Sequence, residues 1–328
     1  MLQSSITISL NFSGIIALKQ KNQVVFKKEY GLGSQGRGLG CPPEAIFCIG
    51  SLTKMFTATA ILLLEERKQL HTNDCIEPFF PECPDAGKMT IHHLLSHTAG
   101  LINYTDDEEI WRLRAKKISP AALIKTFIKK PLIFSPGSQY SYSNSGYVLL
   151  GSIIEQVSGL SYGTFLKRHI FDPQQMFSTQ YSLPIRKKSI QGYSETKGKE
   201  RIKASFHPPS FAYAAGGIYS TVEDLLLWDE RLFKHQILTA ESLDKMLQLY
   251  CFTNAEKTMG YGYGLNIEYL SGKERSIKHI WHRGKTEGFS SLYSKYLELD
   301  TTLIILTNND QLSEEIKALE KQLITLVG

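Results

Sequence analysis

CIGSLTKMFTATAILLLEE, residues 48–66, is a long apolar run in which a serine is followed, three residues later, by a lysine. Apolar residues recur at helical spacing through residues 55–63, which predicts a mostly buried helix ending near residues 66–70. On a helix, Ser51 and Lys54 share one face, with their Cβ atoms about 5–6 Å apart. The stretch therefore fits either an ordinary helix start or a nucleophile beside an activating amine.

The chemistry of such a pair depends on the charge of the lysine. A lysine can take the proton of a serine only when it is partly neutral, and burial or nearby cations lower its pKa in that direction. A nucleophile in the first turn also brings its own backbone N–H to where an oxyanion can bind. The motif alone is weak, since residues 242–245 repeat it in what we interpret as a surface helix.

A second motif, Tyr142-Ser143-Asn144, lies about ninety residues further on, in QYSYSNSGYVLLG. It precedes a strongly amphipathic helical pattern. Serine and asparagine are common N-cap residues, so a capping turn is one interpretation. The other is a loop that presents a phenol and an amide to the cleft that contains Ser51.

A third motif, His282-Arg283-Gly284, ends a strand-like run in IWHRGKTEGFSSLY. It fits an edge strand that turns at a glycine, or a strand whose cationic side chains line a substrate groove. The glycine permits close approach of another backbone segment. The backbone N–H of the next residue, Lys285, can then serve as a second oxyanion donor.

The remaining pattern predicts an α+β fold with an antiparallel sheet flanked by helices and a mostly helical insertion. A hairpin is expected at residues 13–30, and strands return at residues 261–270, 276–284, 289–299 and 301–309, followed by a helix over 313–326. Helices are expected at residues 90–101 (N-cap Thr90, stop Gly100), 120–132, 146–159 (stop Gly159), 161–173 (N-cap Ser161) and 222–233. We assign residues 1–75 and 213–328 to a sheet subdomain and residues 76–212 to a helical subdomain, with the site in the cleft between them.

Composition narrows the class of protein. The chain has 328 residues, 42% hydrophobic and 21% charged, which excludes a disordered chain. The net charge of +5 comes from scattered residues without a nucleic-acid motif, so no nucleic-acid partner is expected. The sequence contains no run of about 18 apolar residues, so no membrane span is expected. Five cysteines and the absence of a signal-peptide pattern favour a reducing, cytoplasmic location, or a periplasmic or secreted one if a leader has been removed.

Taken together, the three motifs resemble those of the serine β-lactamase and penicillin-binding-protein superfamily, which carries S-x-x-K, then Y-x-N, then K-T-G or H-x-G. The resemblance is to the class C β-lactamase-like group, which contains β-lactamases, D-Ala-D-Ala carboxypeptidases, D-aminopeptidases and esterases. It extends from about Phe12 to about Thr307 and includes HLLSHTAGL, AAGGIYSTVEDLLLWDERL and GFSS. It implies a β-lactamase/transpeptidase-like fold and a serine hydrolase that works through an acyl-enzyme, with no metal and no cofactor.

The resemblance also implies roles for individual residues. It makes Ser51 the acylated nucleophile, Lys54 the general base, Tyr142 the residue that relays protons to the leaving group and Asn144 the residue that holds the acyl amide. His282, Arg283 and Gly284 would form the substrate-binding strand, and the backbone N–H groups of Ser51 and Lys285 the oxyanion hole.

Two departures from the pattern bear on the substrate. His282 stands where class C β-lactamases have lysine, and Arg283 and Lys285 are more basic than the small residues usual there. The histidine weakens the resemblance to a β-lactamase, because it is charged only in part where the lysine helps to bind the β-lactam carboxylate. Arg283 and Lys285 either restore anion binding or narrow the groove. Together the three residues favour a small-molecule or peptide substrate that bears a carboxylate or another anion. β-Lactam, ester and D-peptide substrates all remain open. The alternative to an enzyme is a catalytically weak homologue with a binding, sensing or assembly role.

Two further patterns are interpreted as structural. GLSYG at residues 159–163 fits the G-x-S-x-G nucleophile elbow, but a helix rather than a strand precedes it, so Gly159 reads as a helix stop and Ser161 as a cap. His93 and His97 have a metal-like spacing without the glutamate or third ligand that a zinc site needs. We expect both histidines to be packed within the protein, with His97 supporting the site.

Overall fold

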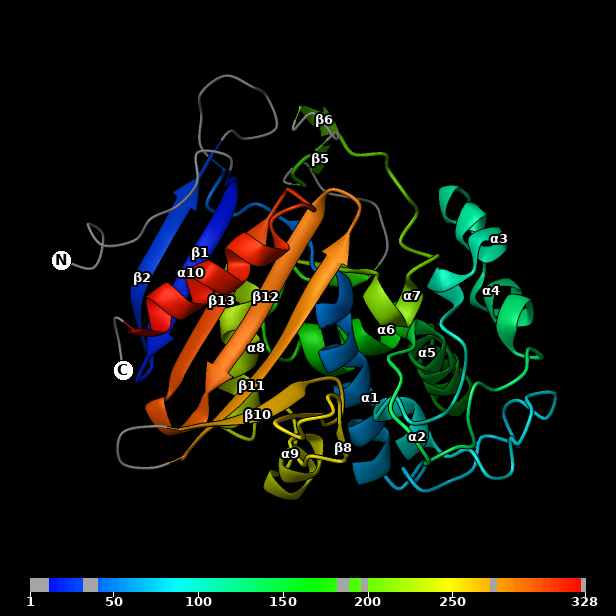
Figure 1. Ribbon diagram of the computed structural model, residues 1–328. Coiled ribbons are helices and arrows are strands. Elements are labelled where there is room, and N and C mark those ends of the chain that lie inside the picture. The colour runs from blue at the N-terminus through cyan, green and yellow to red at the C-terminus, as the bar shows by residue number, and fades with distance from the viewer. Residues whose placement is uncertain (1–11, 32–40, 182–188, 196–199, 272–275, 326–328) are drawn as a thin grey trace.

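An eight-stranded antiparallel sheet forms one side of the computed structural model (Figure 1), which describes residues 12–31, 41–181, 189–195, 200–271 and 276–325. Its strand order is β2-β1-β13-β12-β11-β10-β9-β8. The strands are β1 Gly14–Gln20, β2 Gln23–Tyr30, β8 Cys251–Phe252, β9 Met259–Tyr261, β10 Asn266–Ser271, β11 Ser276–Thr286, β12 Phe289–Tyr296 and β13 Thr301–Thr307. The hairpin predicted at residues 13–30 is β1–β2, which turns at Lys21 and Asn22, both with positive φ. Residues 1–11, whose sequence shows no signal-peptide pattern, lie outside the described residues.

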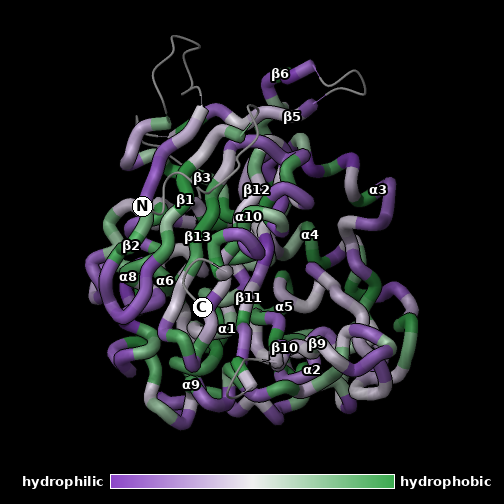
Figure 2. Tube along the Cα trace, turned by 60° about the vertical axis from the view of Figure 1, so that its left-hand side comes forward, coloured by the Kyte–Doolittle hydropathy of each residue, from purple (hydrophilic) through white to green (hydrophobic). Residues whose placement is uncertain are grey.

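Alternating side chains of the sheet enter two separate cores, as the two-residue period of a strand requires. On β1, Ile16 and Leu18 pack with α10 (Ser313–Thr325). Ile15 and Ala17 point the other way, into the main core. Figure 1 shows α10 across one face of the sheet and α8 (Val222–Phe233) behind it. Figure 2 shows the hydrophobic residues gathered along β1, β13 and their neighbours inside the molecule.

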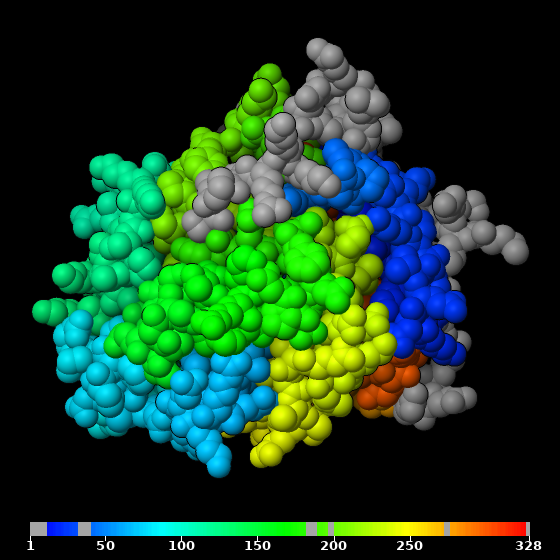
Figure 3. Space-filling view, turned by 180° about the vertical axis from the view of Figure 1, so that it is seen from behind, coloured from blue at the N-terminus to red at the C-terminus, as the bar shows by residue number. Residues whose placement is uncertain are grey.

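Helices and irregular segments from the middle of the chain cover the second face of the sheet, so that little of the sheet is visible from behind (Figure 3). Helix α1 (Thr53–Glu66) runs through this layer, and all but its last two residues are buried. The other helices are α2 Ile91–Leu95, α3 Glu108–Trp111, α4 Pro120–Phe127, α5 Asn144–Ser158, α6 Tyr162–Leu166, α7 Tyr213–Gly216 and α9 Ala240–Met246. Short strands β3 Phe47–Cys48, β7 Ile218–Ser220 and β4 Gln180–Tyr181 form a small second sheet, and β5 Tyr193–Glu195 pairs with β6 Arg201–Lys203.

The predicted helix ends are mostly confirmed. Thr90 caps α2 with a reciprocal capping box, Ser161 caps α6, and Gly159 ends α5 in the left-handed region with φ of 69°. The expected stop at Gly100 is wrong, because α2 already ends at Leu95. His97, with φ of 58°, then turns the chain away from the helix axis.

The architecture confirms the predicted α+β class, with an antiparallel sheet flanked by helices. Within the described part of the chain, no helix is both long enough and apolar enough to cross a membrane.

Candidate active site

Ser51 lies in a short 3-10 helix, η2 (Gly50–Leu52), directly before α1. The sequence predicted Ser51 in the first turn of the buried helix, but in the structure that helix begins two residues later, at Thr53. Gly50 has φ of 50°, which places the turn in the left-handed region where glycine is favoured. The serine is therefore held by a tight turn at the N-terminus of a long buried helix.

Ser51 Oγ is the point at which two other predicted residues meet. Lys54 Nζ lies 3.1 Å from it and Tyr142 Oη lies 3.0 Å from it. Tyr142 comes from the segment just before α5, ninety-one residues away along the chain. The structure thus brings together a hydroxyl, an amine and a phenol from two distant segments.

The amine of Lys54 is buried, and burial lowers its pKa well below the usual value. Its other contacts are Asn144 Oδ1 and Ala215 O, each at 2.8 Å. A neutral amine has two N–H donors and one lone pair. The two carbonyl oxygens take the two donors, which leaves the lone pair for the O–H of Ser51.

Tyr142 is half-buried, and the loss of solvent around its hydroxyl raises the pKa of the phenol above the usual value, although the hydrogen bond to Ser51 opposes this. The phenol therefore keeps its proton and donates to Ser51 Oγ. Of the two groups that contact Ser51, Lys54 is the better suited to accept a proton, because its pKa is lowered while that of Tyr142 is raised.

Asn144 is the first residue of α5 and lines the cavity that contains Ser51. Its Oδ1 accepts from Lys54, and its Nδ2 donates to Thr105 Oγ1 at 3.1 Å. The side chain fixes the lysine as well as facing the cavity. Ser143 is the N-cap, but its side chain makes no capping hydrogen bond, so the motif is not a simple capping turn.

Strand β11 approaches η2 so closely that only glycine fits at the contact. A Cβ on Gly284 would lie 2.1 Å from Ile49 O, and a Cβ on Gly50 would lie 2.9 Å from the backbone nitrogen of Lys285. The Ser51 turn and the Lys285 N–H are therefore adjacent. This is the arrangement that two oxyanion donors require.

His282 is buried and lies beside the Ser51 group rather than presenting a charge to it. Its Nε2 is 3.0 Å from Tyr261 Oη. Burial, reinforced by the nearby Lys54, lowers the pKa of His282 to about 3. The ring is neutral at physiological pH, so the expected cationic donor at this position is absent.

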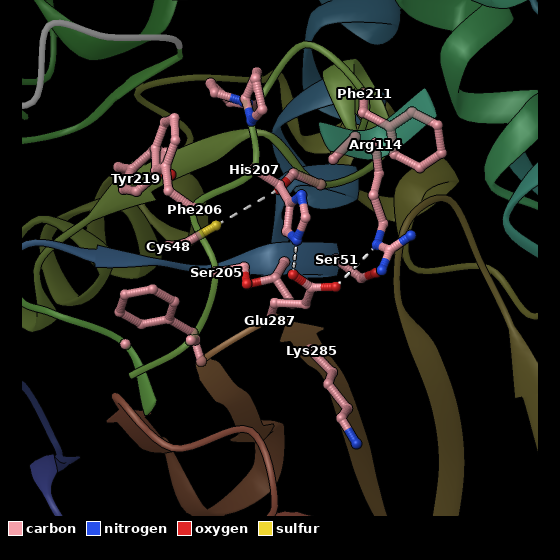
Figure 4. A pocket seen from close by; sticks show the side chains of 18 of the residues that line it. Cys48, Ser51, Arg114, Ser205, Phe206, His207, Phe211, Tyr219, Lys285 and Glu287 are labelled. Carbon is pink, nitrogen blue, oxygen red and sulfur yellow. Dashed lines mark hydrogen bonds and ion pairs between the residues drawn. The ribbon is translucent and has the colours of Figure 1, made fainter. Parts of the chain in front are cut away.

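Arg283 and Lys285 also differ from expectation. The guanidinium of Arg283 packs 4.6 Å from the centre of the Trp281 ring and lies 3.5 Å from Glu320 on α10. Figure 4 shows the side chain of Lys285 extending away from Ser51. The alternation of side chains along β11 explains this, because His282 and Gly284 occupy the face toward Ser51 while their neighbours occupy the other. His282 and Arg283 therefore offer no free charge beside Ser51, whereas Lys285 still lines the cavity.

His97 contributes to the site through Tyr142. Its Nδ1 accepts a hydrogen bond from the backbone N–H of Ser143 at 3.2 Å, and its carbonyl accepts from Ser141 N–H at 2.9 Å. The ring centre lies 4.4 Å from that of Tyr142. Burial and the nearby Lys54 lower the pKa of His97 well below its usual value, so the ring is a neutral acceptor. It fixes the segment that carries Tyr142.

A cavity of about 530 Å³ opens above Ser51 and is also lined by Asn144 and Lys285. Much of its wall is aromatic, with Tyr104, Trp111, Phe206, Phe211, Tyr219 and Phe289. Besides Lys285, four basic or acidic side chains that the motifs did not predict line it: Arg114, Lys203, His207 and Glu287. Figure 4 shows Arg114, His207 and Glu287 close together. None of them belongs to a recognisable motif, and only the fold brings their three segments together.

The remaining patterns have structural explanations. Ser161 donates and accepts within its own helix cap, and His93 Nδ1 accepts from Thr90 N–H in the capping box of α2. In the repeated S-x-x-K motif on α9, Lys245 is paired with Glu65 at 2.8 Å. The described residues contain no group of three or more His, Cys, Asp or Glu side chains that is arranged to hold a metal ion.

The family description "Beta-lactamase" matches residues 12–326, nearly the whole chain. The chain belongs to the Beta-lactamase family. This confirms the predicted superfamily and, with it, a serine hydrolase that acts through an acyl-enzyme on amide or ester carbonyls.

Individual relatives span several members of the superfamily. The chain is 27% identical to penicillin-binding protein 4* of Bacillus subtilis (strain 168), over 94% of this chain and 71% of that protein. A penicillin-binding protein from Bacillus halodurans has the same fold, with a TM-score of 0.84 at 23% identity over 96% of this chain and 97% of that one. A D-stereospecific amidohydrolase from Streptomyces sp. has a TM-score of 0.80 at 25% identity over 94% of both chains. These similarities confirm the β-lactamase/transpeptidase-like fold.

Proposed function

We propose that Ser51 is the nucleophile of this hydrolase, Lys54 its general base and Tyr142 the residue that returns the proton to the leaving group. The observation that carries the proposal is the meeting of Lys54 Nζ and Tyr142 Oη at Ser51 Oγ, at 3.1 Å and 3.0 Å. Burial of the lysine supplies the neutral amine that the nucleophile needs.

In the first step, Ser51 Oγ bonds to the substrate carbonyl carbon while its proton passes to the Lys54 amine. The carbonyl electron pair moves onto oxygen, which the backbone N–H groups of Ser51 and Lys285 stabilise. The tetrahedral intermediate then collapses, the leaving amine or alkoxide takes the Tyr142 proton, and Lys54 reprotonates the phenol. Water attacks the resulting ester by the same route, which frees Ser51 and releases the acid.

The other motif residues have supporting roles in this proposal. Asn144 holds Lys54 through Oδ1 and offers its remaining Nδ2 hydrogen to the acyl group of the substrate. Gly284 has no side chain, so β11 lies close enough to η2 for the Lys285 N–H to reach the oxyanion. His282 acts as a neutral polar neighbour of Tyr142, with ring centres 6.3 Å apart.

We further propose that the site occupies the cleft between the sheet subdomain (1–75 and 213–328) and the helical subdomain (76–212). In support, Ser51 and Lys285 come from the first, and Tyr142 and Asn144 come from the second. The five cysteines are free thiols, which supports our placement of the chain in a reducing compartment.

For the substrate, we propose a small amide or ester rather than a molecule recognised by its carboxylate. Arg283 is not part of the cavity lining and pairs with Glu320, and His282 is neutral. Lys285 lines the cavity, but its side chain extends away from Ser51. The D-stereospecific amidohydrolase among the relatives supports a D-aminoacyl amide as the first compound to test.

Covalent labelling combined with turnover tests the proposal. Wild-type protein and Ser51→Ala are treated with a fluorophosphonate probe and with a fluorescent penicillin, and the labelled peptide is identified by mass spectrometry. Both are then assayed with a chromogenic cephalosporin, a p-nitrophenyl ester and D-amino-acid amides. We expect labelling and turnover that depend on Ser51. Equal labelling of the variant would contradict the assignment. A folded wild-type protein without any turnover would favour a homologue that serves binding, sensing or assembly.

A further inference from the structure

The carboxylate of Glu287 projects into the cavity above Ser51 (Figure 4). Glu287 follows β11 directly, at the turn into β12, two residues after the proposed oxyanion donor Lys285. The adjacent Gly288, with φ of 83°, closes the turn, and its N–H donates to Asp310 Oδ2 at 2.8 Å. The backbone that carries the carboxylate is therefore anchored on the sheet beside the proposed oxyanion hole.

Two side chains from other segments hold the carboxylate in one orientation. Arg114, on η4 (Arg112–Ala115), donates from Nε to Oε1 at 3.0 Å. His207 Nε2 contacts Oε2. Each oxygen thus has one protein partner. Because a carboxylate has about four acceptor positions, acceptor capacity remains on both oxygens, and 29% of the side chain stays exposed.

Arg114 is already committed to protein partners. Its Nη1 donates to Trp111 O at 3.2 Å, and its guanidinium lies 4.8 Å from the centre of the Trp111 ring. Arg114 therefore fixes the position of the Glu287 carboxylate, and the negative charge of Glu287 offsets the positive charge of Arg114. The aromatic wall around the pair lowers the local polarity, which strengthens any further interaction with the free face of Glu287.

We propose that Glu287 binds the α-ammonium group of the substrate, so that the enzyme acts on amides or esters of amino acids whose amine is unblocked. The proposal rests on the function assigned to Ser51. The α-nitrogen of an aminoacyl group is separated from the reacting carbonyl by one carbon. The carboxylate lies two residues from the donor that would hold that carbonyl oxygen. The aromatic wall then receives the amino-acid side chain.

The test compares matched substrates that differ only at the amine. D-phenylalanine p-nitroanilide and its N-acetyl derivative are assayed with wild type, Glu287→Gln and Glu287→Asp, and p-nitrophenyl acetate reports the acyl-enzyme chemistry in each. Glu109→Gln, on an exposed position of α3, is the matched control. We expect wild type to prefer the free amine by roughly 10- to 100-fold in kcat/KM, the range for one charge-assisted hydrogen bond. Glu287→Gln should lose this preference, so that its kcat/KM for the free-amine substrate falls to that for the N-acetyl derivative. Glu109→Gln should stay within about twofold of wild type on all three substrates.

The outcomes separate this inference from the proposed function. Partial return of the preference in Glu287→Asp would support direct recognition of the amine. An equal loss of kcat/KM on all three substrates in Glu287→Gln would overturn the inference. Glu287 would then only stabilise the fold through its contacts with Arg114 and His207. A gain in turnover of a carboxylate-bearing substrate by Glu287→Gln, abolished by adding Arg114→Ala, would also overturn it and assign Arg114 as an anion site. Turnover of p-nitrophenyl acetate that does not depend on Ser51 would instead reject the proposed function.

Discussion

Lys54 Nζ lies 3.1 Å from Ser51 Oγ and has no access to solvent. The two residues belong to different elements, since Ser51 is in the η2 turn and Lys54 is in the first turn of α1. The amine is also held by Asn144 and by the carbonyl of Ala215. Its position therefore depends on three segments of the chain, and its pKa on the exclusion of water.

Replacing Lys54 with methionine should remove the base and preserve the packing of α1, because the two side chains are similar in length. We expect acylation of Ser51 to slow by roughly 100- to 10,000-fold, the usual contribution of a general base. Stopped-flow labelling with a fluorophosphonate probe measures this rate directly. A variant that folds normally and acylates at the wild-type rate would exclude Lys54 as the base.

The pH dependence of kcat/KM follows from the directions of two pKa shifts. Burial lowers the pKa of Lys54, so the neutral base forms below the usual 10.5, and activity should rise with pH through that ionisation. Burial raises the pKa of Tyr142 above 10, so the proton donor survives at high pH and the activity should reach a plateau there. Rates of a p-nitroanilide substrate across the stable pH range test this. A rise centred at the unshifted lysine value would contradict it.

Gly284→Ala should separate the two proposed oxyanion donors. A methyl group there would lie 2.1 Å from Ile49 O, so β11 or the η2 turn must move. Loss of one donor lowers kcat by roughly 100- to 1000-fold. Gly87→Ala is the control, because the nearest atom to its added Cβ is 3.6 Å away. Circular dichroism checks folding, and unchanged kcat in folded Gly284→Ala would reject this placement of the oxyanion hole.

His97 should affect turnover more than substrate binding. His97→Ala leaves the Ser143 N–H without its acceptor next to Tyr142, at a cost of about 1–3 kcal/mol. His97→Asn should restore part of kcat, because asparagine tolerates positive φ and carries an oxygen acceptor. The control is His93→Ala, which removes a similar bond to a backbone N–H far from the phenol. Equal kcat values in the Ala and Asn variants of His97 would contradict a positioning role.

His279 should make the stability of the sheet depend on pH. Burial opposes its charge, but the carboxylates of Glu268 and Glu320 outweigh burial and raise the pKa of His279 above 6.5. The charged ring therefore stabilises the fold fully below pH 6.5, and this contribution declines as pH rises through the raised pKa. Urea unfolding of wild type and His279→Gln at several pH values measures it. The difference between the two should be largest at acidic pH, and a difference that grows with pH would contradict the assignment.

The hairpin, the long apolar helix and the S-x-x-K turn were all predictable, because each depends on local pattern. The direction of each side chain on β11 was also predictable. Once His282 is placed on one face, the alternation of a strand places Arg283 and Lys285 on the other. Their charges predicted a cationic groove, but the alternation of side chains along a strand turns them away from the face that carries His282 and Gly284.

Other parts of the site could not be read from the sequence. Arg114, His207 and Glu287 belong to no motif and meet only when three loops converge. The neutral state of His282 depends on burial by residues from several elements. Both features depend on packing between segments that are far apart in the chain. A short stretch of sequence carries no information about such packing.

The central position of β13 constrains how the protein is made. This strand, residues 301–307, pairs with β1 on one side and β12 on the other. During synthesis, β1 has no partner in the sheet other than β2 until residues 301–307 have left the ribosome. Strand β11, which carries residues of the proposed active site, is linked to β13 only through β12. Closure of this sheet is therefore a non-local event, and until β13 pairs with β1 the hairpin keeps an unpaired strand edge, a surface prone to aggregation that chaperones shield.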